Sequence, residues 1–477
     1  MDYLDILDSY KEEMLESLKT LVRIPSVQSK PVKTADGDIL PFGRPVQDAL
    51  EAMLAEGRSM GFDTFNGDNY GGHIEWKCED SKEVFGIAGH LDVVPEGDGW
   101  KYGPFNPTVE DGCIIGRGVS DDKGPLVAVL YALKALKESG IQPNKNIRII
   151  LGLDEEKGVD GINRYLEIAG QPDLGITPDA GFPLINGEKG ILVFELAQKL
   201  TRSRVKDGLR LTKVEGGTAS NAVPAYAKAA VAGDSAQYES IKDRLAQFVL
   251  ETGYKLKAKK QGPALVIEAS GKAAHGARPE DGLNAISVLM SFLGRLQFAN
   301  EEVNDYIYTY NEKIGFNLHG QGMACDLEDE ASGKLIWNTG LISINEDVAS
   351  ITVNVRYPVT KTSDEVYEGI EETLANTRIG IVKQSDMEPI YMPLDDPMVE
   401  HLMAAYRDET GDTESQAIVI GGGTYAKALN KTLAFGGLFP GEEDTMHQVD
   451  ERLSLESFYK MARIYAKAIY LICFRAW

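Results

Sequence analysis

The sequence predicts an α/β protein in which a mixed-sheet domain is interrupted by a second, α+β domain with an antiparallel sheet. At both ends of the chain, short apolar runs alternate with amphipathic segments, which is the rhythm of α/β domains. Between residues 187 and 385 strand-like runs follow one another with few helical segments, which is typical of an antiparallel sheet with one exposed face. We therefore expect residues 1–186 and 386–477 to form one discontinuous domain and residues 187–385 to form the inserted one.

The first domain is expected to open with helices. Apolar residues at helical spacing predict a helix over residues 4–22 that stops before Ile24-Pro25. The run at residues 147–153 is almost wholly apolar, as expected of a strand with both faces covered. In order, the expected elements are helices at residues 4–22 and 45–60, a strand at 84–88, a helix at 126–138, a strand at 147–153 and a helix at 162–168.

The inserted domain is expected to begin with the strand at residues 191–196. Its further strands are expected at residues 265–269, 341–345 and 349–357, and its helices at residues 238–252 and 284–296. Helical spacing at residues 398–410 and 455–473 then returns the chain to the style of the first domain.

The composition is that of a globular protein, and its charge balance argues against two kinds of partner. Hydrophobic residues make up 43% of the 477 positions and charged residues 26%, which is ordinary for a globular chain. Lys and Arg number 49 against 73 Asp and Glu, a net charge of −24. This acidic balance argues against nucleic acid or an anionic membrane as a partner.

We expect a cytoplasmic protein. Residues 1–19 are acidic and amphipathic and lack the basic and apolar regions of a secretory signal. No apolar run approaches the roughly 18 residues of a spanning helix. The four cysteines, which lie far apart and form no CxxC pair, fit a reducing compartment; they are Cys78, Cys113, Cys325 and Cys473.

A histidine and an acid follow the first predicted strand in the order His90-Leu91-Asp92. His90 would emerge at the carboxyl edge of the sheet, and Asp92 could accept the second N–H of its ring and so fix the tautomer. A structural hydrogen-bonded pair is the alternative interpretation of this motif alone.

Two acidic clusters occupy similar places. Asp121-Asp122 stands between a glycine turn and a helix, where Asp121 could lie between two metals, although the pair could equally cap the helix. Asp154-Glu155-Glu156 ends the strand at residues 147–153. A metal could bind one of these carboxylates and leave its neighbour, with a raised pKa, as a base; an exposed acidic turn is the alternative.

Asp179 and His447 are weak signals singly, but they complete a pattern. Acids and histidines recur at the ends of predicted strands, where ligands bind in α/β sheets. Carboxylates and imidazoles are ligands that can hold two divalent cations. The combination therefore predicts a metal-dependent hydrolase.

Taken in order, these motifs resemble those of the dinuclear zinc metallopeptidases related to aminoacylase, ArgE, DapE and carboxypeptidase G, and among them the PepV-type dipeptidases. The resemblance covers nearly the whole chain. It implies a phosphorylase/hydrolase-like catalytic domain interrupted by a lid domain. The motifs are Gly89-His90-Leu91-Asp92-Val93-Val94-Pro95, Gly116-Arg117-Gly118 leading to Asp121-Asp122-Lys123-Gly124, Asp154-Glu155-Glu156, Pro178-Asp179-Ala180 and Met446-His447-Gln448.

The resemblance implies a role for each metal ligand. Asp121 would bridge two metals. His90 and Asp179 would complete the coordination of one metal, and Glu156 and His447 that of the other. Zn²⁺ is the first candidate, with Mn²⁺ as the alternative.

The same resemblance implies that Asp92 orients His90 and that Glu155 is the general base. It also implies a cis peptide bond between Asp121 and Asp122.

In the inserted domain the resemblance implies residues that contact the substrate. His275 would stabilise the oxyanion, and Asn221 and Arg356 would help to hold the peptide. Main-chain N–H groups of a glycine-rich loop would capture the C-terminal carboxylate of the substrate. The residues of this loop are Gly421, Gly422, Gly423 and Thr424, and Lys427 follows where many relatives would carry arginine.

The resemblance thus implies a monomeric dipeptidase that cleaves dipeptides with a free N-terminus, Xaa-Xaa in general and β-Ala-His among the candidates. A metal-bridging water would attack the peptide bond, with a glutamate as the general base. Two alternatives stay open: an N-acyl amino acid or succinyl-diaminopimelate amidohydrolase, and a catalytically inactive peptide-binding protein. A phosphatase is disfavoured because no DxDx[TV] nucleophile motif is present.

Overall fold

The computed structural model describes residues 2–202 and 208–475. The chain divides into two compact units, which are treated separately below. The first unit comprises Met1–Gly187, Ile390–Val419 and Gly423–Trp477, and the second comprises Glu188–Pro389 and Ile420–Gly422.

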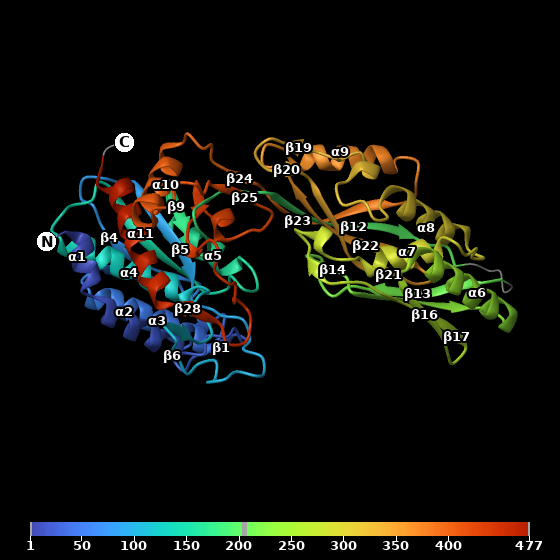
Figure 1. Cartoon of the computed structure of the whole chain (residues 1–477), viewed down its shortest axis with the longest axis horizontal. Helices are drawn as coiled ribbons and strands as arrows, with labels where there is room; N and C mark the ends of the chain where they lie inside the picture. The colour runs from blue at the N-terminus through green and yellow to red at the C-terminus, as the bar shows by residue number, and fades with distance from the viewer. Residues whose placement is uncertain (1, 203–207, 476–477) are drawn as a thin grey trace. The chain divides into compact units, whose positions relative to one another are not determined.

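A nine-stranded mixed sheet forms the centre of the first unit (Figure 1). Its inner strands β8, β5, β9 and β26 run parallel, while β4 and β3 continue the sheet antiparallel at one edge. The order is β24-β11-β26-β9-β5-β8-β4-β3, with β25 paired to β11. The strands are β3 (Asp63–Asn66), β4 (Gly72–Trp76), β5 (Val84–His90), β8 (Asn146–Gly152), β9 (Leu174–Thr177), β11 (Ile185–Glu188), β24 (Ile390–Tyr391), β25 (Ile418–Ile420) and β26 (Thr432–Ala434).

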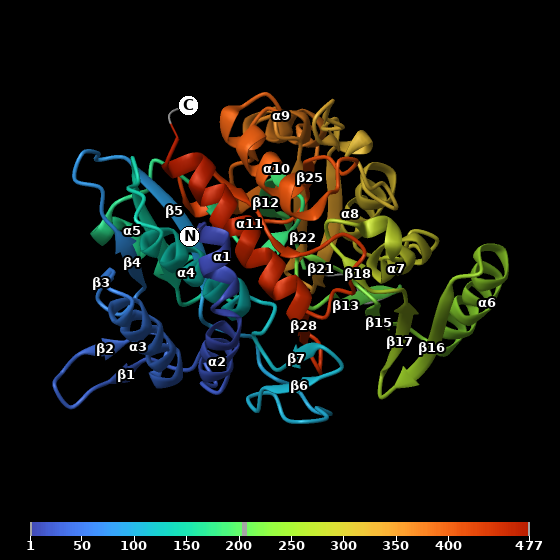
Figure 2. The ribbon, with the colours of Figure 1, turned by 60° about the vertical axis from the view of Figure 1, so that its left-hand side comes forward.

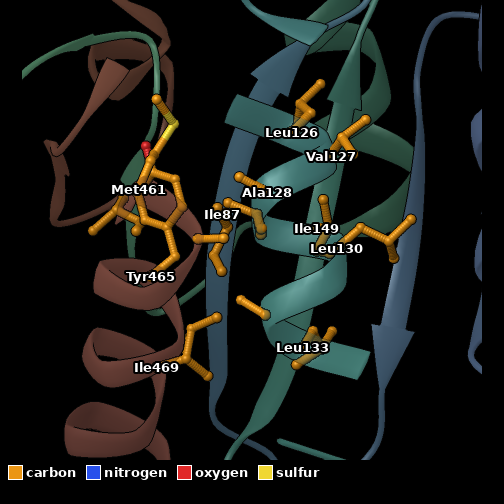
Figure 3. Close-up of a cluster of buried hydrophobic side chains, with 14 of the residues drawn as sticks. Ile87, Leu126, Val127, Ala128, Leu130, Leu133, Ile149, Met461, Tyr465 and Ile469 are labelled. Carbon is orange, nitrogen blue, oxygen red and sulfur yellow. The ribbon is translucent and has the colours of Figure 1, made fainter. Parts of the chain in front are cut away.

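Helices cover this sheet and bury its apolar strands. Ile87 of β5 and Ile149 of β8 pack with Leu130 of α4, and Tyr465 and Ile469 of α11 belong to the same buried cluster (Figure 3). The helices are α1 (Tyr3–Asp8), α2 (Lys11–Val22), α3 (Arg44–Ser59), α4 (Lys123–Glu138), α5 (Asp160–Ala169), α10 (Pro397–Thr410) and α11 (Leu455–Cys473), with the 3-10 turn η3 (Tyr425–Ala428). Of the helices that the structure describes, none is long and apolar enough to cross a membrane.

The single helix predicted over residues 4–22 is wrong, because the structure has two helices there. The Ser9 hydroxyl donates to the carbonyl oxygen of Ile6 at 2.6 Å, so it competes with the next turn of the helix. The Tyr10 ring packs edge-on against Tyr131 of α4, with ring centroids 5.9 Å apart. Tertiary contact at this point therefore overrides a continuous apolar spacing.

The second unit is built on an eight-stranded sheet in which every pair is antiparallel. One face is buried, since Leu192, Phe194 and Leu196 of β12 are core residues while the residues between them are partly exposed. The predicted α/β class, with an antiparallel sheet in the insertion, is confirmed. In order, the strands are β16 (Lys255–Gln261), β17 (Ala264–Ser270), β15 (Tyr226–Ala232), β13 (Arg210–Gly216), β21 (Ile336–Ile344), β22 (Val348–Tyr357), β12 (Gly190–Lys199) and β23 (Gly380–Met387).

In the part of the second unit that the structure describes, four helices cover the buried face of this sheet. Figure 2 shows α7 beside β15 and α6 beside β16. The sequence prediction missed α8 and α9, although an Asn300 cap and a Thr362/Glu365 capping box mark their first turns. The helices are α6 (Ser235–Thr252), α7 (Ala285–Leu293), α8 (Glu301–Lys313) and α9 (Ser363–Leu374), with the 3-10 turns η1 (Pro279–Asp281) and η2 (Gln321–Met323).

Short ribbons complete both units. The ribbon of β14 (Ala222–Val223) and β18 (Ala274–His275) belongs to the second unit; it contains His275 and begins directly after Asn221. The other short pairings are β1 (Val32–Lys33) with β2 (Ile39–Leu40), β10 (Ala180–Gly181) with β27 (Gly437–Leu438), β19 (Glu328–Asp329) with β20 (Gly333–Lys334), and the three strands β28 (Arg452–Ser454), β7 (Cys113–Ile115) and β6 (Thr108–Glu110).

Candidate metal centre

Three neighbouring parallel strands deliver acids and a histidine to one edge of the first unit's sheet. Strand β5 lies between β8 and β9 and ends at His90, which is fully buried. Glu155 and Glu156 follow the end of β8, and Asp179 follows the end of β9. Because parallel strands end at the same edge, these side chains converge.

Asp121 lies at the centre of this cluster. Its Oδ1 is 2.8 Å from Nε2 of His90, and its Oδ2 is 2.9 Å from Nε2 of His447. Nε2 of His447 is also 3.1 Å from Glu156 Oε2, and Nε2 of His90 is 3.5 Å from Asp179 Oδ2. Each oxygen of Asp121 therefore faces one histidine–acid pair.

The donor set fits divalent cations. Ligand atoms of His90, Asp121 and Glu156 lie within 4.8 Å of one another, and so do those of His90, Glu155 and Asp179. Imidazole nitrogens and carboxylate oxygens are ligands for Zn²⁺ and Mn²⁺. The structure thus brings together all five residues expected to bind metal.

The acids at this edge repel one another. Burial raises the pKa of Glu155 to about 8, and the negative charges of Asp179, Glu156 and Asp121 add to the effect against the opposing influence of His90. Burial also raises the pKa of Asp179, with Asp121 as the largest charge contribution. A carboxylate cluster of this kind is stabilised by positive charge.

The two histidines supply part of that charge. Hydrogen bonds with Asp121 and Glu156 raise the pKa of His447 to about 10. Burial would lower the pKa of His90, but hydrogen bonds with Asp121, Asp179 and Asp92 outweigh it and raise the pKa. For Asp121 burial acts upward, yet its bonds to the two histidines hold the pKa well below the usual range.

The main-chain oxygen of Asp92 lies closer to the His90 ring than the carboxylate that was expected to accept its second N–H. Nδ1 of His90 is 2.9 Å from the main-chain oxygen of Asp92 and 3.4 Å from its carboxylate. The carboxylate instead accepts the main-chain N–H groups of Glu155 and Glu156, each at 3.2 Å. Asp92 thus orients the His90 ring mainly through its backbone and the acidic turn through its side chain.

The Asp121–Asp122 peptide bond is cis, which confirms the expectation. The carboxylate of Asp122 is fully buried and accepts the main-chain N–H of His90 at 3.2 Å. The loop that carries Asp121 is therefore tied directly to the end of β5.

Glu451, which sequence reasoning missed, holds the same loop from the other side. This fully buried carboxylate accepts hydrogen bonds from Arg117 Nη1 at 2.8 Å and from the main-chain N–H groups of Gly118, Ser120 and Asp121 at 2.9, 2.9 and 3.2 Å. It lies four residues after His447 in the chain. One side chain thus links the segments that carry two expected ligands; the only sequence signal was Arg117 between two glycines.

Tyr425 packs against His90 and is hydrogen-bonded to Asp154. The Tyr425 hydroxyl donates to Oδ1 of Asp154 at 3.1 Å, and its ring packs edge-on against His90 with centroids 6.3 Å apart. Burial raises the pKa of Asp154 to about 6, and its carboxylate accepts the N–H of Gly161 at 2.6 Å. Asp154 is therefore occupied by α5 and Tyr425.

Three expected substrate-binding residues lie in the second unit. Nδ1 of His275 accepts the main-chain N–H of Ala277 at 3.1 Å, so the neutral ring carries its proton on Nε2. Burial, followed by the charges of Arg356 and Arg278, lowers the pKa of His275 and favours this neutral form. The Asn221 side chain is exposed beside it, since Ala222 pairs with His275 in the β14–β18 ribbon.

Arg356 is a buried cation in the same unit, with only 5% of its surface exposed. Its Nε donates to Oδ1 of Asn354 at 2.8 Å. Among the described residues no acid forms an ion pair with it, and burial lowers its pKa to about 10. A buried guanidinium without an acid is suited to an anionic ligand.

The glycine-rich loop crosses from the second unit to the first between Gly422 and Gly423. A Cβ on Gly421 would lie 3.1 Å from that of Ala277, so the loop passes close to the ribbon that ends in His275. Thr424 caps η3, accepting the N–H of Ala426 at 3.1 Å, and Lys427 lies within η3.

The other histidines make structural contacts. Nδ1 of His73 is 2.7 Å from the Tyr165 hydroxyl, and Nδ1 of His319 is 2.8 Å from the Leu335 oxygen. His401 bonds to a carbonyl oxygen of its own helix.

Comparison with known proteins identifies the family. A model of peptidase family M20/M25/M40 matches residues 86–471. The "Putative dipeptidase" of Staphylococcus epidermidis is 37% identical over 471 residues, which cover 97% of this chain and 98% of that protein. "Putative dipeptidase YtjP" of Bacillus subtilis is 34% identical and covers 96% and 97%.

Solved structures share the fold at low identity. Human carnosine dipeptidase 1 superposes with a TM-score of 0.54 at 17% identity, covering 98% of both chains. Aminoacylhistidine dipeptidase from Vibrio alginolyticus gives 0.56 at 14% identity, covering 97% of both.

Proposed function

This chain belongs to peptidase family M20/M25/M40 and hydrolyses peptide bonds, and from that premise we propose that it is a dinuclear dipeptidase specific for a free N-terminus. The observation that carries the proposal is the placement of Asp121, whose two oxygens face His90 and His447 separately. Such a carboxylate can serve two cations at once.

The five converging residues would hold two divalent cations. We assign His90 and Asp179 to one ion, Glu156 and His447 to the other, and Asp121 to both. Zn²⁺ is the first candidate and Mn²⁺ the second, because both accept this donor set. Bound there, divalent cations would polarise a carbonyl oxygen and lower the pKa of a water between them.

Glu155 would move the proton. Burial and the negative charge of Asp179 raise its pKa, and a carboxylate with a raised pKa is a stronger base. Glu155 would take a proton as the water oxygen bonds to the peptide carbon, and would give it to the amine nitrogen as the C–N bond breaks. Asp92 would keep the acidic turn in place through its bonds to the N–H groups of Glu155 and Glu156.

The second unit would bind the peptide and its developing charge. Nε2–H of His275 would donate to the oxyanion, since Nδ1 is already an acceptor for Ala277. Arg356 and Asn221, with the N–H groups of Gly422, Gly423 and Thr424, would hold the peptide and its C-terminal carboxylate. The unpaired charge of Arg356 supports this role.

We propose that the enzyme acts as a cytoplasmic monomer. Its four cysteines are free thiols, as is usual in a reducing compartment. Sedimentation at the concentration of the activity assay tests the oligomeric state. A dimer that loses activity when it dissociates would contradict the proposed monomer.

Substrate comparison tests the proposal. Purified chain loaded with Zn²⁺ or Mn²⁺ is given Ala-Ala, β-Ala-His, N-acetyl-Ala-Ala and N-acetyl-alanine, and free amino acids are measured. We expect cleavage of free dipeptides and little cleavage of N-acetylated ones. Preference for the N-acetylated compounds would replace the proposal with an amidohydrolase, and stoichiometric binding of dipeptide without cleavage would indicate an inactive binding protein.

A further inference from the structure

Two buried asparagines of the second unit lie directly opposite each other on neighbouring strands. Asn338 of β21 pairs with Asn354 of β22 in antiparallel register, and each is 2% exposed. We propose that this asparagine pair is a positioning device: Asn338 sets the ribbon that carries Asn221 and His275, and Asn354 sets the guanidinium of Arg356. The inference rests on the proposed function and adds two residues to it.

Both side chains lie on the sheet face opposite the helix-covered core. Their strand neighbours Trp337, Val353 and Val355 belong to that core, and side chains alternate along a strand. The asparagine pair therefore shares the opposite face with Arg356, which is at the next position but one along β22.

Asn338 acts on the ribbon through its side-chain amide. Its Nδ2 donates to the carbonyl oxygens of Ser220 at 2.8 Å and Ala222 at 3.0 Å, the residues on either side of Asn221. Ala222 in turn pairs with His275, and the N–H of Gly276 donates to the Asn221 oxygen at 2.7 Å. Movement of this short ribbon would displace Asn221 and His275 together.

Asn354 acts on the guanidinium. Its Oδ1 accepts Nε–H of Arg356 at 2.8 Å, which fixes the plane of the group and leaves the two terminal nitrogens for another acceptor. A carboxylate that bridges those nitrogens is the ligand that this geometry suits best.

The chemistry of asparagine explains why this residue stands at position 338. One amide nitrogen can donate to two carbonyl oxygens, which neither aspartate nor leucine can do. Oδ1 of Asn338 is buried without a hydrogen-bond partner, which is unfavourable. A residue needed only to fill the space would avoid that unpaired acceptor, so the two donors are what the position requires.

The first test concerns the ribbon. Asn338→Asp and Asn338→Leu are compared with Asn311→Asp and Asn311→Leu, because Asn311 of the same unit also donates Nδ2 to a carbonyl oxygen, that of Met290 at 2.8 Å, away from the ribbon. Deuterium uptake is followed in peptides covering residues 219–224 and 272–278. We expect faster uptake there in the position-338 variants alone; equal uptake in both sets would overturn the proposal.

The kinetics of Ala-Ala cleavage distinguish the role of Asn338 from that of Asn354. Replacement of Asn338 should lower kcat by about 10-fold to 10²-fold, the usual consequence of a misplaced catalytic group, with metal content unchanged. Asn354→Leu should raise KM about 10-fold, which is the worth of one charge-assisted hydrogen bond. A uniform loss of activity that follows thermal stability in all variants would reduce both residues to structural roles.

Double variants show whether each asparagine acts through its proposed target. Asn338→Leu should cost nothing further in kcat once His275 is alanine, and Asn354→Leu nothing further in KM once Arg356 is methionine. Fully additive losses would contradict the proposal. If the parent chain cleaves no dipeptide while the ribbon still loosens in the position-338 variants, the proposed function fails and the positioning of the ribbon by Asn338 stands.

Discussion

The acidic edge of the first unit's sheet and the sheet face of the second unit that carries Arg356 have opposite charges. At the first, burial and neighbouring acids raise the pKa of Glu155 and Asp179. At the second, Arg356 is buried without an acid partner among the described residues. Each unit is therefore suited to a ligand of the opposite charge, a cation for the acids and an anion for the guanidinium.

The two regions are also held in different ways. The acids and His90 stand directly at strand ends and are fixed by main-chain N–H groups. His275 stands on a ribbon of two short strands, and the side-chain amide of Asn338 donates hydrogen bonds to the carbonyl oxygens of Ser220 and Ala222 in and beside that ribbon. Changes in the first unit should therefore alter metal binding or proton transfer, and changes in the second should alter turnover while metal content stays constant.

Glu155→Gln should cause the largest loss. Removing a general base usually lowers the rate by about 10²–10⁴. Metal content, measured by elemental analysis on the same sample, should stay at the parent level, because Glu155 is assigned to proton transfer. A variant that cleaves dipeptides at nearly the parent rate would show that another group is the base.

His275→Ala tests the second unit. Loss of an oxyanion donor typically lowers kcat by about 10²–10³. Because His275 belongs to the other unit and is assigned no metal, elemental analysis should find the parent amount of metal. If the variant loses metal, His275 is a ligand and the division of roles between the two regions is wrong.

Glu451→Gln should weaken metal binding although Glu451 is not itself assigned as a metal ligand. The neutral amide would lose part of the bonding to Arg117 and to the loop that carries Asp121, and such outer contacts are worth about 10–100-fold in affinity. Zn²⁺ titration of the metal-free protein measures this. Glu443→Gln is the matched control, since Glu443 is exposed and pairs with Arg452 at the surface; equal effects of the two variants would refute the role.

His73→Phe should produce the smallest effect, on stability alone. Burial, followed by the charges of Arg148 and Lys77, lowers the pKa of His73 to about 3. In the unfolded chain the pKa is near 6.5, so the unfolded state binds the extra proton as the pH falls from about 6.5 towards 3. The folded state should lose up to about 1.4 kcal/mol per pH unit over that window.

Urea unfolding of parent and His73→Phe at pH 7 and pH 5 measures the difference. The variant also leaves the Tyr165 hydroxyl without its partner, so its stability should be lower at pH 7 but should fall less on acidification. Identical pH dependence in the two proteins would show that His73 titrates normally in the fold.

Much of the first unit could be predicted because its signals are local. The apolar run before Gly152 predicts the strand, and the acids that follow it predict that the carboxyl end of this strand carries site residues. The helix from Leu455 to Cys473 was predicted at its full length, because a serine cap and a continuous apolar stripe mark it. The interruption at Ser9 could not be predicted, because it depends on Tyr10 packing against α4.

The supporting residues of both regions could not be predicted for a related reason. Glu451 is remote in sequence from the loop it holds, and Asn338 is remote from Ser220 and Ala222. Neither has a distinctive neighbour in the sequence. Their roles follow only from burial and from the donors and acceptors that the fold brings to them.

The most direct test of the account is the number of Zn²⁺ ions bound per chain, measured by elemental analysis after dialysis of parent and Asp121→Asn. We predict two ions in the parent and a loss of at least one in the variant, because each oxygen of Asp121 faces a separate histidine. A parent that retains fewer than two ions at saturation, or a variant that still retains two, would contradict a bridging Asp121 and with it the dinuclear centre.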